Sequence, residues 1–126
     1  APIVYNGTEV GVTQKRGIHD ANSQGMEECR QPMLWGDEQD TDLYANFWYL
    51  SHLRRNHPAL WRGGRRTLFL DSATQTYAYA REDGHEALVV GLNMSDEPRT
   101  LVVPYVERGT KITFELPPWT GDVASV

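Results

Sequence analysis

A short polar segment, residues 17–30, gathers the side chains that could most readily do chemistry. Its sequence GIHDANSQGMEECR contains His19 beside Asp20, two adjacent glutamates and the only cysteine, Cys29. A Cys–His pair can act as nucleophile and base only when its side chains lie within hydrogen-bond reach. His19 and Cys29 stand ten positions apart in a segment without a hydrophobic period. We therefore favour an ordinary free thiol over nucleophilic catalysis.

The spacing of the histidines and the cysteine does not indicate a metal site either. The four histidines and Cys29 show none of the short paired spacings that zinc sites use. Positions on the surface and at helix ends are the simpler interpretation. We predict neither a metal nor another cofactor.

Carboxyl groups are plentiful in the first part of the chain and raise the possibility of glycoside hydrolysis. Such chemistry needs two opposed carboxyl groups, about 5–5.5 Å apart for retention or about 6.5–9.5 Å for inversion. Only Glu9 stands next to a predicted rigid element, and acidic loops are usually solvated. We predict no catalytic pair in this chain. The candidates are Glu9, Asp20, Glu27, Glu28, Asp37 and Glu38.

The tryptophans could stack on sugar rings or pack inside the protein. Trp48 falls on the apolar face of a predicted helix and is expected in the core. For Trp35, Trp61 and Trp119 we favour burial where the helical part meets the β part, because amphipathic rings are common at such junctions. Trp61 and Trp119 are kept as possible sugar-stacking residues.

The elements that must position these side chains change character along the chain. Residues 2–11, PIVYNGTEVG, begin with β-forming residues and end in a polar turn, which predicts a strand. Residues 12–39 predict a long loop. Residues 41–57 predict a helix, capped by Asp40, Thr41 or Asp42 and ended by Pro58.

After Gly63 and Gly64 the pattern becomes that of short strands separated by turns. Five strands are predicted, at 67–71, 76–81, 86–93, 99–104 and 111–116, and the spacing favours an antiparallel sandwich. The Tyr77–Ala80 alternation indicates one buried and one wetter face. The expected fold is mainly β with an N-terminal β-loop-α appendage. The expected domains are residues 1–62 and 63–126.

Composition excludes several partner classes. A formal net charge of −5 argues against nucleic acid, since phosphate binding needs clustered Lys and Arg. The longest apolar run, residues 87–90, is far below the roughly 20 residues that cross a bilayer. One cysteine allows no internal disulfide and fits a reducing, cytoplasmic setting. A start at Ala-Pro suggests a cut inside a longer polypeptide.

Five segments together resemble, in order, the C-terminal portion of the α-amylase family of glycoside hydrolases. They are PIVYNGTEVG, ECRQPMLW, DLYANFWYLSHLRRNHPALWRG, YAYAR and LVVGLNMSDEPRTL. The resemblance implies that residues 2–11 are the last strand of a (β/α)8 barrel, that residues 41–57 are its last helix, and that the C-terminal β-sandwich follows from about residue 65. It also implies a parent that acts with retention on α-glucans or maltooligosaccharides.

The resemblance further implies that the catalytic carboxylates lie upstream of Ala1, so that this chain alone is inactive. Arg30 matches an arginine that holds glucose at the cleavage subsite. The acidic partner expected four positions earlier falls on Met26. Glu27, Glu28 or Asp20 could replace it, and Arg30 could instead anchor the loop through an ion pair. Glu9 would lie at the barrel mouth.

Two further expectations concern what the isolated chain does. The alternative to an inactive portion of an enzyme is a carbohydrate-binding module that uses Trp61, Trp119 or Tyr79. An interaction protein without enzymatic activity is a weaker possibility. Residues 2–11 and the helix would also expose apolar surface and unpaired backbone, which predicts a homo-oligomer formed through the N-terminal strand and helix.

Overall fold

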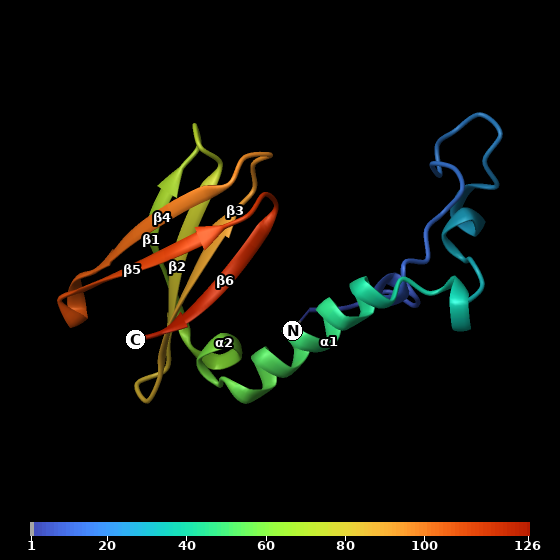
Figure 1. Ribbon diagram of the computed structural model, residues 1–126. Helices are drawn as coiled ribbons and strands as arrows, with labels where there is room; N and C mark the ends of the chain where they lie inside the picture. The colour runs from blue at the N-terminus through green and yellow to red at the C-terminus, as the bar shows by residue number, and fades with distance from the viewer. Residues whose placement is uncertain (1) are drawn as a thin grey trace. The chain divides into compact units, whose positions relative to one another are not determined.

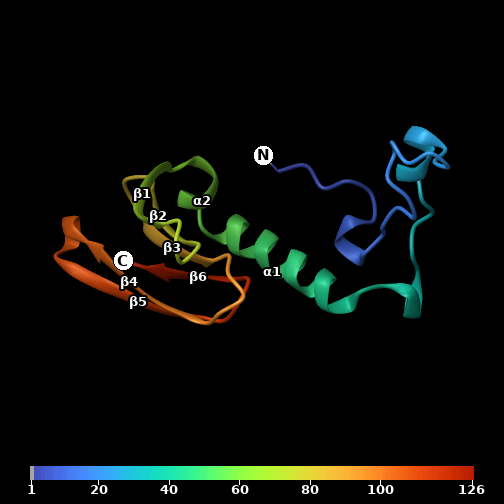
Figure 2. The ribbon, with the colours of Figure 1, turned by 90° about the horizontal axis from the view of Figure 1, so that it is seen from above.

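The computed structural model of the chain describes residues 2–126, and Figures 1 and 2 show them from two directions. The chain forms two compact units, and the boundary between them lies between Leu53 and Arg54. No helix among the described residues is long and apolar enough to span a membrane. The domain boundary predicted between residues 62 and 63 stays a prediction.

The first unit begins with an irregular segment instead of the strand predicted over residues 2–11. Residues 2–5 pair with no strand in the described part of the chain, and Ile3 is 96% exposed. Gly7 and Gly11, with φ of 80° and 83°, turn the backbone on either side of a 3-10 helix, η1 (Thr8–Val10). The strand prediction is therefore wrong for this chain, because a strand needs a neighbouring edge and this segment has none. The predicted self-association stays a prediction.

The predicted long loop contains two more short 3-10 helices and leads into the main helix. They are η2 (Gly25–Cys29) and η3 (Gly36–Glu38), followed by α1 (Thr41–Asn56). The backbone N–H of Leu43 donates to Asp40 Oδ1 at 2.9 Å, so Asp40 is the residue that caps α1. Trp48 is 55% exposed and stacks on His52 at 3.9 Å, so its predicted burial is wrong.

The second unit is the predicted antiparallel sandwich, with one strand more than expected. A short helix, α2 (Ala59–Arg62), precedes it. One sheet has the order β1-β2-β3-β6 and the other pairs β4 with β5 (Figure 1). The strands are β1 (Gly64–Asp71), β2 (Thr76–Glu82), β3 (Ala87–Asn93), β4 (Arg99–Tyr105), β5 (Thr110–Leu116) and β6 (Thr120–Ser125), with η4 (Val106–Arg108) between β4 and β5.

The core of the sandwich lies between the two sheets. Ala78 and Ala80 of β2 are fully buried while Tyr77 and Tyr79 alternate with them on the other face, which confirms the predicted alternation. Small residues on the larger sheet leave room for the ring of Phe114. The remaining members of the buried cluster are Ala87, Val89, Leu101, Val103, Tyr105 and Leu116.

A polar network joins the two sheets at one edge of this core. The hydroxyl of Tyr105 on β4 donates to Glu82 Oε1 on β2 at 2.7 Å, and Arg66 Nη2 on β1 donates to the same oxygen at 3.0 Å. Arg66 also pairs with Glu107 at 2.9 Å. The Tyr105 hydroxyl, followed by Arg66, lowers the pKa of Glu82 from its ordinary value of 4.5.

Acid should weaken this network. A lowered pKa in the folded state contributes stability above the unfolded value and loses it as the pH falls through the folded pKa. The Glu82 side chain is 39% exposed, so we expect Tyr105→Phe to lower the free energy of unfolding by only about 0.5–1 kcal/mol at a pH near 7. This loss of unfolding free energy should be smaller at a pH near 3. Urea unfolding of both proteins at each pH measures it. An equal cost at both pH values would contradict this role of Glu82.

Candidate functional site

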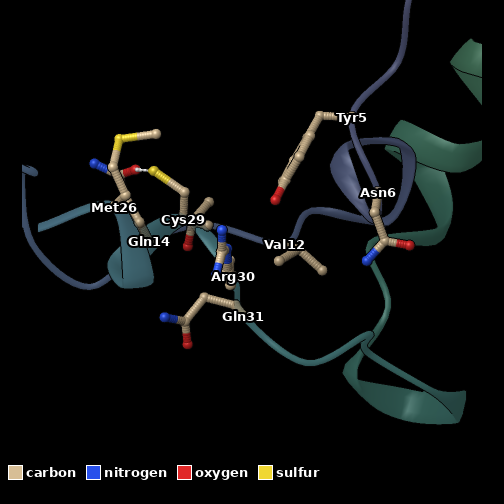
Figure 3. A pocket seen from close by; sticks show the side chains of 9 residues that line it. Tyr5, Asn6, Val12, Gln14, Met26, Cys29, Arg30 and Gln31 are labelled. Atoms are coloured by element: carbon tan, nitrogen blue, oxygen red, sulfur yellow. Dashed lines mark hydrogen bonds between the residues drawn. The ribbon is translucent and has the colours of Figure 1, made fainter. Parts of the chain in front are cut away.

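A pocket of about 490 Å³ in the first unit contains Arg30, the residue with the most specific functional prediction. Its walls come from two segments far apart in sequence. The N-terminal segment supplies Tyr5, Asn6 and residues 12–14, and η2 with the residues after it supplies Met26, Cys29, Arg30 and Gln31 (Figure 3). The lining combines an aromatic ring, a guanidinium and amides, which suits a polar ligand with apolar faces.

Hydrogen bonds around η2 hold this arrangement. Cys29 Sγ lies 3.2 Å from Gln14 Oε1, which ties η2 to the 12–14 segment. Gln31 Nε2 donates to the carbonyl of the buried Glu28 at 2.9 Å. His19 is exposed and makes no contact with Cys29 in the hydrogen bonds of the described residues. The cysteine therefore has a positioning contact and no base beside it.

Arg30 is exposed and pairs with Glu27, at 2.8 Å between Nη1 and Oε1. Of the three proposed acidic partners only Glu27 contacts it: Glu28 accepts from the Gln24 backbone N–H, and Asp20 accepts from that of Gly17. The Arg30 and Glu27 side chains are 67% and 59% exposed. An exposed pair contributes only about 0–1 kcal/mol, so it leaves the guanidinium free to exchange partners.

Glu9 does not share the pocket of Arg30. It lies in η1, half-buried, and lines a second pocket of about 360 Å³ with Tyr44, Phe47, Trp48 and other residues. Tyr5 and Asn6 line both pockets and stand between the two predicted site residues. Tyr5 and Asn6 are not among the site residues predicted from the sequence, although the polar turn that follows an apolar run at this point is a signal for them.

Neither pocket offers the paired carboxyl groups of a glycosidase. Among the described residues, no acidic side chain lines the first pocket and Glu9 alone lines the second. In the second unit the pKa of three carboxyl groups is lowered, in each case chiefly by a hydrogen-bond donor: Asp71 by Thr74, Glu82 by Tyr105 and Asp83 by Arg62. A general acid needs the opposite shift. Within residues 2–126, no three ligating side chains gather for a metal.

The sugar-stacking candidates of the second unit are on its surface. Trp61 is 51% exposed, and Trp119 is 65% exposed with its ring N–H donating to Asp96 Oδ1 at 2.8 Å. Trp35, in the first unit, is 73% exposed. The predicted burial of these three rings where the helical and β parts meet stays a prediction, because it depends on how the two units pack together. Tyr79 is half-buried, with the Arg65 guanidinium 5.8 Å from its ring centre.

No protein-family model matches the chain, but individual relatives do. An enzyme named alpha-amylase 2, from Dictyoglomus thermophilum, is 34% identical over 97 residues, which is 76% of this chain and 16% of that protein. A cyclomaltodextrinase from Geobacillus thermopakistaniensis is 34% identical over 110 residues, 86% of this chain and 17% of that protein. The chain thus spans about a sixth of the length of these relatives.

Solved structures agree with these matches. A cyclomaltodextrinase superposes with a TM-score of 0.66 at 30% identity, covering 80% of this chain and 16% of its own. A cyclic α-maltosyl-(1→6)-maltose hydrolase from Arthrobacter globiformis, 24% identical, has a TM-score of 0.77 over 100% of this chain and 27% of its own, and supports the fold alone. The chain is therefore homologous to a C-terminal portion of glycoside hydrolases of the α-amylase family.

Proposed function

We propose that the chain forms part of the substrate-binding rim, together with the C-terminal β-sandwich, of a retaining enzyme that acts on α-glucans or maltooligosaccharides. The observation that carries the proposal is the position of Arg30, exposed in a pocket of a chain homologous to α-amylase-family enzymes. A guanidinium offers five N–H donors in a fixed fork, which suits neighbouring sugar hydroxyls.

The same proposal includes the absence of hydrolysis by these 126 residues alone. Retaining hydrolysis uses a nucleophilic carboxylate and a second carboxyl group about 5–5.5 Å away. Glu9 has no carboxyl partner among the residues lining its pocket, and the pocket of Arg30 has no acid in its lining. The catalytic groups would come from a part of the enzyme outside this sequence, and the sandwich would stabilise that enzyme.

Replacing Arg30 should weaken sugar binding by the chain. Amide NMR of the full chain titrated with maltoheptaose should show a dissociation constant on the order of 1 mM, since one charged group acts in an open pocket. We expect shifts at Asn6, Gln31 and Arg30. Arg30→Ala should weaken binding about tenfold, the loss expected for a hydrogen bond to a charged donor, and Arg30→Lys should restore part of it.

Arg55→Ala is the matched control, since it removes the same charge from an exposed position on α1. Arg55→Ala should have the same dissociation constant for maltoheptaose as the unmodified chain. If Arg30→Ala binds maltoheptaose as the unmodified chain does at this pocket, Arg30 is only a loop anchor for Glu27 and the proposed rim is overturned.

A further inference from the structure

Trp119 stands on the surface of the sandwich in an uncommon and fixed conformation. Its backbone has a φ of 56°, a value that bulky residues rarely adopt. Pro117 and Pro118 precede it and restrict the approach of the chain. The ring N–H donates to Asp96 Oδ1 at 2.8 Å, and 65% of the residue is exposed. A strained backbone that presents a large exposed ring indicates a use for that ring.

The two loops that carry Trp119 and Asp96 are joined by a buried amide. Asn93, 1% exposed at the end of β3, places Nδ2 at 2.8 Å from the Glu97 carbonyl, 3.1 Å from that of Leu116 and 3.0 Å from that of Pro117. The β3–β4 and β5–β6 loops accordingly meet at one end of the sandwich (Figures 1 and 2). The Trp119–Asp96 pair is thus set on a rigid base before any ligand arrives.

A concave surface of about 380 Å³ adjoins Trp119 in sequence and offers polar groups. It is lined by Pro118, Arg99, Thr100 and Glu115 among others. Thr100 Oγ1 donates to Glu115 Oε2 at 2.7 Å, so the two strands present an ordered hydroxyl–carboxylate pair on the exposed face. The Arg99 side chain turns the other way, and its Nε donates to Ser95 Oγ at 3.4 Å. Hydroxyl and carboxylate groups are donors and acceptors that match sugar hydroxyls.

The other exposed tryptophan of the sandwich unit is less suited to stacking. Trp61 has the Arg62 guanidinium 5.7 Å from its ring centre, which covers one approach to the ring with a cation. The hydrogen bond of Trp119 holds its ring by the Nε1 edge, and the residue is 65% exposed. The C–H face of a pyranose packs on such an aromatic face, while its hydroxyls reach the surrounding polar groups.

We infer that Trp119, with Asp96 and the Thr100–Glu115 surface, forms an α-glucan-binding site on the β-sandwich, separate from the pocket of Arg30. The α-glucan class rests on the proposed function, whereas the site itself rests on the geometry of Trp119. Bound here, a polysaccharide chain would be held to the protein without being cleaved.

Affinity electrophoresis of the full chain in gels that contain soluble starch tests this site. We expect starch to retard the chain and Trp119→Ala to reduce the retardation constant about tenfold, with Trp119→Phe retaining about half of it. Asp96→Leu, which releases the ring N–H, should reduce it about threefold. Trp61→Ala is the matched control and should be retarded like the unmodified chain. Circular dichroism should show the same fold for all four variants.

The outcomes separate this inference from the proposed function. Equal retardation of the chain and Trp119→Ala overturns the inference, as does the absence of any retardation by starch. Loss with Arg30→Ala but not with Trp119→Ala keeps the proposed rim and overturns the sandwich site. Retardation as strong in gels with hydroxyethyl cellulose overturns the α-glucan class. Binding of a proline-rich peptide in place of starch at Trp119 would also overturn it.

Discussion

Phe114→Ala is expected to lower the free energy of unfolding of the sandwich by about 3–5 kcal/mol, the range for an aromatic ring removed from a packed core. Phe114 is 2% exposed and belongs to the cluster between the two sheets. The alanines of β2 are too small to fill the space that its ring would vacate. Urea unfolding followed by circular dichroism measures the change. Val102→Ala, on the outer face of β4 at 49% exposure, is the control and should change little.

A substitution at Gly91 tests the packing of Phe114 independently. A Cβ atom at Gly91 would lie 2.7 Å from Cδ2 of Phe114, so Gly91→Ala should cost about 1–3 kcal/mol in the unmodified chain. In the Phe114→Ala background the added methyl enters vacated space. We expect the double variant to be more stable than the sum of single effects predicts, by about 0.5–3 kcal/mol. Simple additivity would mean that the ring does not pack against Gly91.

Asn93→Asp is expected to destabilise the sandwich by about 3–5 kcal/mol near neutral pH, as for an uncompensated buried charge. The substitution keeps the shape of the side chain but replaces the Nδ2 donor by an oxygen. That oxygen would face the carbonyls of Glu97, Leu116 and Pro117, all within 3.1 Å of the present nitrogen. The oxygen that accepts from Ser95 would remain.

The pH dependence of this variant distinguishes charge from packing. Burial and the facing carbonyl oxygens should raise the pKa of the new carboxyl above its unfolded value. A raised folded-state pKa gives relative stability at low pH that is lost as the pH rises through it. The difference in the free energy of unfolding between the variant and the unmodified chain should therefore become smaller as the pH falls. Urea unfolding of both proteins at the same pH values measures this difference. A gap that does not change with pH would contradict the donor role of Asn93.

Sequence patterns were most informative where local chemistry decides the structure. Helix α1 follows from a capping Asp40 and a terminating Pro58, and both signals act within one turn. The strands of the sandwich follow from β-forming residues between turns. The sequence pattern does not predict strand β6, because its sequence, TGDVAS, contains Gly and Asp and shows little alternation of apolar and polar residues. It becomes a strand by pairing with β3, which is a tertiary effect.

Residues 2–11 are the opposite case, in which a strong local pattern does not form a strand. Ile3, Val4 and Tyr5 have the propensity of a strand, but propensity cannot form one without a neighbouring edge. The site predictions divide in the same way. Arg30 is predicted as a site residue from its sequence context and stays a prediction. Its contact with Glu27 and the contact of Trp119 with Asp96 depend on how loops fold, which the sequence pattern does not reveal.

The most direct test of the account is the fate of maltoheptaose in a sample in which the chain demonstrably binds it. Amide NMR establishes binding at the pocket of Arg30, and chromatography of the sugar then recovered from the tube reports cleavage. We predict bound but intact maltoheptaose, because no paired carboxyl groups line the two pockets. Shorter maltooligosaccharides that form with the chain and disappear with Glu9→Gln would contradict the account and place catalysis within these 126 residues.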